Sequence, residues 1–487
     1  MTIIDATAPQ TLPHTAVHQV VGLRPGVDVV QVQGGYELRH PWGRHQLRGI
    51  TAKDVEQLIE LSHHPIDDTD LLDSRLRTLL ISIANLVTVG LVDAGGNELI
   101  LLTPINRRAS VLKPVRVDAA GATLSRFAYL RHVPDSDTGL VLESPLSCHR
   151  MTINDPGVAA FLAALCTGAS TAGAARAGNI DAKVAELLIL VLGASGFLER
   201  PNESELALWD FHDLLFHSRS RYGLHDYVAG GMFAHTEFEH AAALQQPESP
   251  DTAIDLDMPD WDKVLANDPG FTQVLEDRRS VRAYRQDAID KVQLGELLYR
   301  AARARGLGQA GGEHPYASVD RPYPMGGGLG ELEIYLAVHR CEDLPAGIYR
   351  YDSAGHRLFL RNGDPAFRQK LYEQAWLATG GQLTDPQVQL CITSRLARVQ
   401  WKYSSIAYSV TLKHVGVLFQ NLYLVATAMG LSPCGNGSGD TDLVSRAIGV
   451  DWMSEPPVGE FLIGGRPAEA RASATGFADV VRQSRAG

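Results

Sequence analysis

The chain has 487 residues, of which 45% are hydrophobic and 21% are charged, as in ordinary globular proteins. This length predicts about two to four domains. The net charge of −12 argues against a general binder of nucleic acid or anionic membranes, because such proteins are normally basic. A site for an anionic cofactor would therefore have to be a local basic cluster.

The N-terminal segment and the cysteines together predict a cytoplasmic protein. Residues 1–19 lack a basic region followed by an apolar core, so they do not resemble a signal peptide. The cysteines are odd in number and form no CxxC or Cys/His ligand pattern, which argues against a disulfide framework and a metal site. These cysteines are Cys148, Cys166, Cys341, Cys391 and Cys434.

The N-terminal half contains an internal repeat. Residues 34–61 resemble residues 137–165, with Pro41 matching Pro145. Self-similarity of this kind indicates one supersecondary unit that is made twice.

Each copy of the repeat predicts the same order of elements. Short alternating segments and a turn come first, then a helix with apolar spacing, then a second helix. We expect the second helices to end near Gly90 and Gly196, where glycine suits a left-handed C-cap. This order predicts two winged-helix-like modules, residues 26–112 and residues 113–235.

The function of the two modules stays open at this level. Their second helices carry no basic stripe, which argues against DNA binding. They are either structural or dimerisation modules, or clamps that capture an extended peptide by β-augmentation. Residues 236–269 are polar, contain Pro and Asp, and predict a connector.

An arginine-rich turn opens the C-terminal half, at the start of residues 276–304, which then become helical. Arginine presents a planar fork that binds phosphate with two hydrogen bonds, and serine adds a hydroxyl donor. A solvated basic turn would have the same sequence, so the signal is weak by itself. The residues concerned are Arg278, Arg279, Ser280, Arg282 and Arg285.

A second candidate binding segment is a glycine loop. Pro324, Met325, Gly326 and Gly327 precede a predicted strand at 331–339. Consecutive glycines let the backbone approach a flat ligand closely. A flexible turn is the alternative, and the GxGxxG dinucleotide fingerprint is absent.

The apolar run 404–429 predicts a buried core helix. It contains Lys413 and His414, which a membrane span would tolerate poorly. We expect Gly430 to cap this helix.

Two further glycine-containing segments follow that helix. We expect Gly435, Asn436 and Gly437 to form a loop against which a ring system could lie. Residues 461–469 predict a strand that ends in Gly-Gly-Arg, and Arg466 is another candidate phosphate ligand.

The order of these motifs resembles the SagB-type azoline dehydrogenases, a branch of the nitroreductase-like FMN flavoproteins. The resemblance covers residues 270–470, and its most specific element is a KYxxxAYxxxLxHxGxxxQN pattern. The duplicated front end is similar to the leader-peptide recognition modules of such oxidases. The pattern is carried by Lys402, Tyr403, Tyr408, Leu412, His414, Gly416, Gln420 and Asn421.

The resemblance implies an α+β fold for residues 270–487, with a mostly antiparallel sheet, helices and a homodimer. It implies FMN at the dimer interface. The arginine turn and Arg466 would hold the phosphate, and the glycine loop of the partner chain would line the ring. The implied FMN-binding residues are Arg278, Arg279, Ser280, Arg282, Pro324, Met325, Gly326, Gly327, Asn421, Gly435, Asn436, Gly437, Gly465 and Arg466.

The implied reaction is the oxidation of thiazoline or oxazoline rings in a precursor peptide to thiazoles or oxazoles. The front-end modules would bind the peptide, and a cyclodehydratase is a candidate partner, whereas nucleic acid and membranes are not expected. Two other functions stay open. One is an NAD(P)H-dependent reductase of nitro or quinone compounds, and the other is a flavin-free scaffold that docks the peptide.

Lys402 and Tyr403 are the candidate catalytic residues. Removal of a ring proton needs a base, and a neighbouring lysine cation favours the tyrosine phenolate. We interpret Tyr403 as the base and Lys402 as its electrostatic partner, with exchanged roles as the alternative. Adjacent strand residues point apart, so the backbone must turn there, as it would at a helix capped by Ser404 or Ser405.

Overall fold

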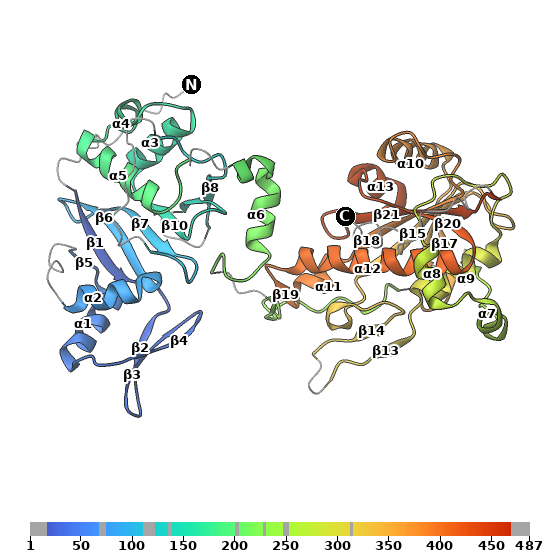
Figure 1. The fold of residues 1–487 in the computed structure, drawn as a ribbon, viewed down its shortest axis with the longest axis horizontal. Helices are drawn as coiled ribbons and strands as arrows, with labels where there is room; N and C mark the ends of the chain where they lie inside the picture. Colours follow the sequence, from blue (N-terminus) through green and yellow to red (C-terminus); the bar gives the residue numbers. More distant parts are fainter. Residues whose placement is uncertain are drawn as a thin grey trace, which may run out of the picture. The chain divides into compact units, whose positions relative to one another are not determined.

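The structure is a computed structural model that describes residues 17–67, 75–110, 122–134, 139–199, 204–226, 230–246, 253–311 and 315–468. The chain folds into two compact units, unit 1 (Met1–Val228) and unit 2 (Ala229–Gly487) (Figure 1). The boundary predicted between residues 112 and 113 lies outside the described residues.

The main element of unit 1 is a seven-stranded antiparallel sheet with the strand order β5-β1-β6-β7-β10-β9-β8. A separate three-stranded sheet consists of β2, β3 and β4. The strands span Val17–Leu23 (β1), Asp28–Val32 (β2), Gly35–His40 (β3), Gly43–Leu47 (β4), Ile66–Asp67 (β5), Val87–Asp93 (β6), Glu98–Pro104 (β7), Tyr129–His132 (β8), Leu140–Glu143 (β9) and His149–Ile153 (β10).

Helices α1 to α5 of unit 1 share one hydrophobic core with the sheet. Their starts follow from polar caps: Thr51 and Asp54 form a capping box at α1, and Asp155 caps α3 just before a proline. The helices span Ala52–His63 (α1), Arg75–Ser82 (α2), Pro156–Cys166 (α3), Thr171–Gly178 (α4), Ala182–Ala194 (α5) and Phe211–Arg219 (α6), with short 3-10 turns at Ala84–Leu86 and Ser204–Leu208.

The predicted repeat is present as a hairpin followed by a helix, β3-β4-α1 in the first copy and β9-β10-α3 in the second. The first hairpin belongs to the three-stranded sheet and the second to the seven-stranded sheet. Strand β7 of the first copy pairs with β10 of the second, with Leu102 opposite Met151. Leu58 and Phe161 from the two copies lie in the same core. The two stretches predicted as modules therefore share one sheet and one core.

The predicted helix end at Gly90 is wrong, whereas the one at Gly196 is confirmed. Helix α2 ends at Ser82, and Gly90 lies inside strand β6, opposite Val20. The β-branched residues around Gly90 favour a strand, and a Cβ there would come within 2.8 Å of Val20 Cγ2. Gly196 follows α5 with a φ of +79°, as expected for a C-cap glycine.

Unit 2 is built on a second seven-stranded sheet, with the order β12-β17-β16-β15-β18-β21-β20. All neighbouring strands run antiparallel, which confirms the predicted mostly antiparallel sheet. The strands span Ala253–Asp255 (β12), Leu332–Val338 (β15), Gly347–Asp352 (β16), Arg357–Asn362 (β17), Val388–Ser394 (β18), Leu431–Asn436 (β20) and Pro457–Gly465 (β21).

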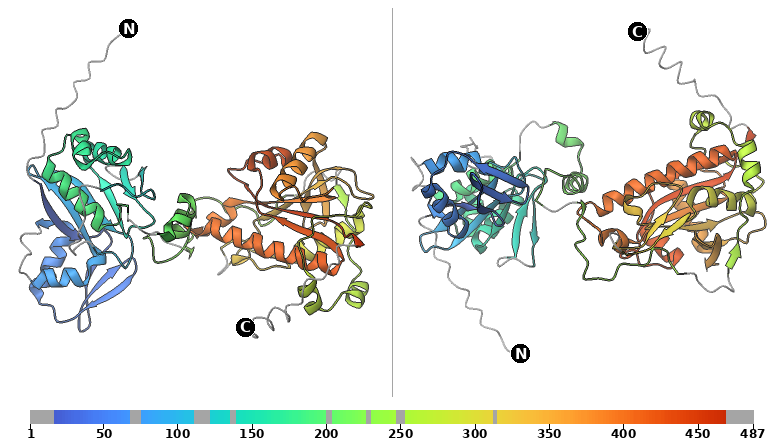
Figure 2. Two further views of the ribbon diagram at one scale, coloured as in Figure 1. Left: turned by 45° about the horizontal axis from the view of Figure 1, so that its top comes forward. Right: turned by 90° about the horizontal axis from the view of Figure 1, so that it is seen from below.

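Helices cover both faces of this sheet, and Figure 2 shows the longest described one, α12, running along the sheet. On one face Leu297 of α9 and Leu418 of α12 pack with Leu336 of β15. The preceding residue of that strand, Tyr335, packs on the other face with Val444 of α13 and with α10. The helices span Trp261–Asn267 (α7), Phe271–Asp277 (α8), Lys291–Ala302 (α9), Pro365–Ala378 (α10), Leu396–Gln400 (α11), Ala407–Ala428 (α12) and Thr441–Ile448 (α13).

Smaller elements of unit 2 lie near the end of α11. They are the ribbon of Gly230–Gly231 (β11) with Tyr403–Ser404 (β19), the ribbon of Gly306–Gly308 (β13) with Ser318–Asp320 (β14), and the 3-10 turn η5 (Gly326–Gly328).

The apolar run 404–429 forms the predicted core helix, α12. Gly430 follows it with a φ of +68°, which confirms the predicted cap. Within the described residues, none of the helices combines the length and the apolar character that a membrane span requires. The predicted loop at Gly435 and Asn436 is wrong, because both residues belong to strand β20 and pair with β21.

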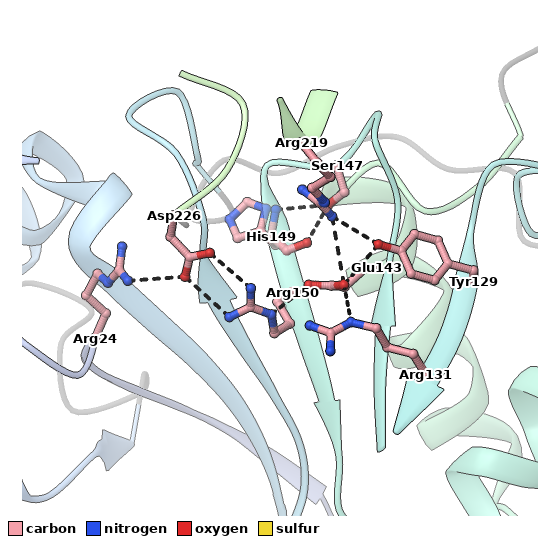
Figure 3. A network of polar contacts seen from close by, with 9 residues as sticks. All are labelled: Arg24, Tyr129, Arg131, Glu143, Ser147, His149, Arg150, Arg219 and Asp226. Atoms are coloured by element: carbon pink, nitrogen blue, oxygen red, sulfur yellow. Dashed lines mark hydrogen bonds and ion pairs between the residues drawn. The ribbon is translucent and has the colours of Figure 1, made fainter. Parts of the chain in front are cut away.

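A buried ionic network connects the unit 1 sheet with Asp226, beyond helix α6 (Figure 3). Glu143 is fully buried and accepts hydrogen bonds from Arg131 Nε and Arg150 Nε, both at 2.7 Å. Arg150 Nη2 also donates to Asp226 Oδ1 at 3.0 Å, and Asp226 pairs with Arg24. Buried charges of this kind are tolerated only when each one has a partner.

Glu143 makes the stability of unit 1 depend on pH. Burial acts to raise the pKa of its carboxyl, but the hydrogen bonds from Arg131 and Arg150 outweigh burial and lower the pKa from 4.5 to about 2. A lowered carboxyl pKa stabilises the folded state above the unfolded pKa, and this contribution is lost as the pH falls from 4.5 towards 2.

We expect Glu143→Gln to lower the free energy of unfolding of unit 1 by about 3 kcal/mol at neutral pH, because it removes the carboxylate that the arginines bind. The difference from the wild type should shrink as the pH falls through 4.5, where the wild-type carboxyl starts to be protonated in the unfolded chain. Urea unfolding of both proteins between pH 7 and pH 3 measures this. A difference that stays constant over that range would show that the carboxylate is not the stabilising group.

Candidate functional site

Lys402 lies just beyond helix α11, among aromatic side chains. Its Nζ donates a hydrogen bond to the Tyr316 hydroxyl at 2.5 Å, and that hydroxyl donates to the Gly327 carbonyl at 2.9 Å. The ammonium lies 4.9 Å from the ring centroid of Tyr316, 5.3 Å from that of Tyr403 and 6.0 Å from that of Phe233. Aromatic rings attract a cation at these distances, so the surroundings hold the lysine side chain in place.

Tyr403 reaches the same glycine loop, residues 324–330. A Cβ at Gly326 would lie 3.0 Å from the Tyr403 hydroxyl. The backbone turns after Tyr403 through Ser405, which has a φ of +64°, and then enters α12. The predicted cap position at Ser404 or Ser405 is wrong, because the helix begins at Ala407 and its N-cap residue is Ile406.

A histidine holds the glycine loop against α12. His414 Nε2 accepts a hydrogen bond from the Gly326 backbone N–H at 2.7 Å. Its Nδ1 lies 2.5 Å from Oε1 of Glu331, which is fully buried. Because Nε2 accepts a hydrogen bond from the backbone, Nδ1 must carry the ring proton and donate a hydrogen bond to Glu331. The loop therefore has a fixed position beside Lys402 and Tyr403.

Residues 230–246, which we call the strap, bind the segment that leads to Lys402. Arg395 donates to the carbonyls of Ala242 and Ala243, and Trp401 Nε1 donates to that of Phe238. Part of the predicted connector 236–269 is thus attached to the candidate site.

Arg398 makes the most extensive strap contacts. It is fully buried, and its Nη1 donates to the Ala241 carbonyl at 2.7 Å and contacts His240 Nδ1 at 3.1 Å. Burial lowers the pKa of Arg398 to about 10, with the nearby Arg395 as a second cause. Burial, with the Arg398 charge, also lowers the pKa of His240 to about 4, so this ring is neutral at physiological pH.

The predicted phosphate ligands meet around Tyr423 of α12. Ser280 Oγ lies 2.7 Å from the Tyr423 hydroxyl, which also accepts a hydrogen bond from the Gly435 N–H at 2.7 Å. The Arg278 guanidinium lies 5.3 Å from the Tyr423 ring centroid. Tyr423 itself was not among the predicted site residues. The tertiary fold therefore brings the arginine turn and β20 together.

The same arginine turn continues along the ends of β20 and β21. The N–H of Val281 bonds to the Pro433 carbonyl at 2.9 Å, and that of Arg285 bonds to the Gly465 carbonyl at 3.0 Å. Arg466 directly follows Gly465, so the end of β21 joins the basic segment.

Four predicted cofactor residues have other surroundings. Arg279 is exposed, and its Nη1 donates to carbonyls of its own turn. Asn421 donates its amide N–H to the Ala301 carbonyl at 2.6 Å, near the end of α9. Met325 packs against the core between the sheet and α12. Pro324 is exposed.

A cavity of about 420 Å³ lies between α12, the segment after β20 and the start of β21. The predicted residues Asn436 and Gly437 line it, as do Tyr408, Leu412 and Gly416 of the sequence pattern. Its volume falls within the usual range for small-molecule sites. Within the described residues, no group of three or more His, Cys, Asp or Glu side chains could hold a metal ion.

Glu460 of β21 lines this cavity and was missed by the sequence analysis. It is 3% exposed, and its carboxyl has no hydrogen bond or ion pair with another described residue. Burial raises its pKa from 4.5 to about 7. A lone acid in the otherwise apolar segment GEFLIGG was the available sequence signal. Perturbed acids in cavities are functional-site candidates.

Comparisons with known proteins found one family match within each of the two units. Residues 275–464 match the nitroreductase family, and residues 122–226 match the family described as cyanobactin oxidase ThcOx. A protein of Methanocaldococcus jannaschii named as a nitroreductase is 25% identical over 189 residues, which are 38% of this chain and 84% of that protein.

Two solved structures illustrate the range of similarity. One is a protein of Ralstonia eutropha described as a nitroreductase, with 22% identity, a TM-score of 0.36, and coverage of 45% of this chain and 90% of that chain. Another is a chain of the E. coli microcin synthetase McbBCD complex with truncated pro-MccB17 bound, with 19% identity, a TM-score of 0.35, and coverage of 55% and 99%.

The two family matches support an oxidoreductase with a nitroreductase-like unit 2 and a cyanobactin-oxidase-like segment in unit 1. The nitroreductase match includes the arginine turn, the glycine loop, Lys402, Tyr403 and β21. The other match includes Glu143 and Asp226 of the ionic network.

The carboxyl of Glu460 gives a test of the cavity. Because its folded pKa is raised, folding opposes its ionisation, and its contribution makes the protein less stable as the pH rises from 4.5 to about 7. We expect Glu460→Gln to raise the free energy of unfolding by about 3 kcal/mol at pH 8 and to change it little at pH 4.

Thermal unfolding at both pH values measures this effect, with Asp442→Asn as an exposed control that should change little at either pH. An identical effect of Glu460→Gln at pH 4 and pH 8 would show that the buried carboxyl does not titrate as stated.

Proposed function

We propose that the protein is an FMN-dependent oxidase of the SagB type that converts thiazoline or oxazoline rings of a precursor peptide to thiazoles or oxazoles. The observation that carries the proposal is the meeting of Lys402 and Tyr403 at one glycine loop, within a nitroreductase-like unit. The cyanobactin-oxidase match in unit 1 supports a peptide substrate in natural-product biosynthesis.

The residues around Tyr423 and the cavity fit FMN. Arg282 Nε is buried and has no hydrogen-bond partner among the described residues, so it can donate to an added acceptor such as phosphate. A Cβ at Gly416 or Gly437, both in the cavity wall, would meet no atom within 4 Å, which leaves room for a flat ring.

In the proposed site, phosphate contacts come from the arginine turn and ring contacts from the glycine loop and the end of β20. The isoalloxazine, when bound, accepts the hydride. The proposed FMN ligands are Arg278, Arg279, Ser280, Arg282, Pro324, Met325, Gly326, Gly327, Asn421, Gly435, Asn436, Gly437, Gly465 and Arg466.

The chain itself supplies the base and the charge that assists it. The Tyr403 oxygen takes the proton from the azoline ring carbon, and the Lys402 ammonium stabilises the negative charge that develops on the ring nitrogen. Both side chains are held in advance, Lys402 by its hydrogen bond to Tyr316 and Tyr403 by packing against Leu329 and Ala407. Preorganised groups of this kind lower the barrier without reorganising during the reaction.

Unit 1 is proposed to bind the precursor peptide. Strand β8 lies at the edge of its sheet, where an extended peptide can add a strand by β-augmentation. A homodimer, with the glycine loop of one chain facing the FMN of the other, and a cyclodehydratase partner are parts of the same proposal. Measuring KM for an azoline peptide with and without its leader distinguishes peptide binding by unit 1 from a purely structural role. The leader should lower KM only if unit 1 binds it.

A second candidate is an NAD(P)H-dependent reductase of nitro or quinone compounds. The nitroreductase match favours it, since the matched relative of Methanocaldococcus jannaschii is named as a nitroreductase. Oxidation of NADH by a nitroaromatic compound without any peptide would support this function over the azoline oxidase. A purified protein without flavin colour would instead favour the flavin-free scaffold that docks the peptide.

We expect Lys402→Met and Tyr403→Phe each to reduce azoline oxidation by roughly 10²-fold or more, the range for loss of a general base. Mass spectrometry of an azoline peptide measures the reaction as the loss of two hydrogens per ring. Lys413→Met is the control, because Lys413 is exposed and, among the described residues, its side chain bonds only to Ser409. Turnover near the wild-type rate in both variants, with FMN still bound, would remove the pair from the mechanism.

We expect Arg278→Ala and Arg466→Ala to weaken FMN binding by about 1.5–3 kcal/mol, the scale of a hydrogen bond to a charged group. Arg446→Ala is the matched control and should change the affinity little, because this exposed guanidinium pairs with Asp442 on α13. Fluorescence titration of the apoprotein with FMN gives the three dissociation constants. Wild-type affinity in both Arg278→Ala and Arg466→Ala would place the phosphate elsewhere.

A further inference from the structure

The hydrogen-bond partner of Lys402 is a tyrosine distant in sequence. Its Nζ lies 2.5 Å from the hydroxyl of Tyr316, whereas its contact with Tyr403 is to the ring, 5.3 Å from the centroid. We propose that Tyr316 is a positioning residue for Lys402 and that Phe233 of the strap completes the enclosure around the ammonium. This inference rests on the proposed function, because it concerns the same lysine.

The directions of its two hydrogen bonds show that Tyr316 connects Lys402 to the glycine loop. Its single hydroxyl proton goes to the Gly327 carbonyl at 2.9 Å, so its oxygen can only accept from Lys402. The lysine is thereby linked through one side chain to the glycine loop. Gly327 has a φ of +68°, and a Cβ there would collide with Lys402 Nζ and lie 2.8 Å from the Tyr316 hydroxyl. Glycine is therefore required for this arrangement.

The strap supplies the other wall of the enclosure. Phe233 has a φ of +53°, a conformation that is uncommon and unfavourable for a bulky residue. It is held there because its N–H bonds to the carbonyl of Lys402 itself at 3.1 Å, and Gly231 pairs with Tyr403. Its ring also packs on Trp401 with the centroids 5.6 Å apart. Backbone strain of this kind persists where the surroundings over-determine it, often at functional sites.

The consequence of the enclosure is a lysine whose charge is in place before the substrate binds. A free lysine has a flexible four-carbon stem and samples many positions. A hydrogen bond to Tyr316 and contacts with two further rings restrict Nζ to one of them. Supporting residues of this kind matter because small displacements of a catalytic group reduce rates strongly.

The first test measures the lysine without relying on any enzymatic activity. We expect Tyr316→Phe to increase the rate at which Lys402 is acetylated by about fivefold, the factor for the loss of one hydrogen bond. Limited acetylation of the intact protein followed by peptide mass spectrometry gives this rate. Lys413 is the internal control, and Tyr349→Phe is the matched variant, since it also removes a hydroxyl that donates to a carbonyl. An unchanged acetylation rate of Lys402 in Tyr316→Phe would show that Tyr316 does not hold the lysine in position.

The second test is a double-mutant cycle in azoline oxidation. We expect Tyr316→Phe to lower kcat about tenfold, with KM and FMN content unchanged, and to have no further effect in the Lys402→Met background. An equal loss in both backgrounds would mean that Tyr316 acts independently of Lys402. If the wild type oxidises no azoline, the proposed function fails, and the acetylation rates still decide whether Tyr316 positions the lysine.

Discussion

The buried guanidinium of Arg398 is the interaction on which the candidate site depends. Its Nε donates to the Leu329 carbonyl at 2.7 Å, its Nη1 to the Ala241 carbonyl at 2.7 Å, and its Nη2 to the Ala317 carbonyl at 2.9 Å. These carbonyls belong to the glycine loop, to the strap and to the residue before β14 (Figure 1). A buried carbonyl without a donor is costly, so the three backbone segments are stabilised together around one side chain. The same segments surround Lys402, so its position follows from that of Arg398.

Buried carboxyls in unit 2 differ according to whether the fold gives them a partner. Glu331 is paired with His414, which in turn holds Gly326, and this chain of contacts fixes backbone. Glu460 has no comparable partner among the described residues, and burial alone raises its pKa to about 7. A carboxyl in that state opposes folding at neutral pH. An unfavourable contribution to stability of this kind is common for residues that belong to a functional site.

Local physical chemistry explains which elements were predictable. Alternation and apolar spacing identified strand β15 and helix α12, and the left-handed preference of glycine identified the caps at Gly196 and Gly430. The same rule failed at Gly90, where glycine is required by the approach of Val20 across the sheet. It also failed at Gly435, because pairing with β21 makes a strand of a glycine-rich segment that resembles a loop. In both cases a contact between distant strands outweighed the local preference.

The sequence by itself determined the arginine turn, the glycine loop and the pair Lys402–Tyr403, since each consists of residues close together in the chain. The mostly antiparallel fold of unit 2 followed from the resemblance of these motifs to a known family. Only the tertiary structure decided that Lys402 bonds to Tyr316, 86 residues away, and that Phe233 lies beside it. It also decided that Glu460 lines a cavity and has no hydrogen-bond or ion-pair partner for its carboxyl among the described residues. The physical reason is that such contacts depend on how loops and sheets pack. A hydrogen bond between distant residues leaves no periodicity and no fixed spacing in the sequence.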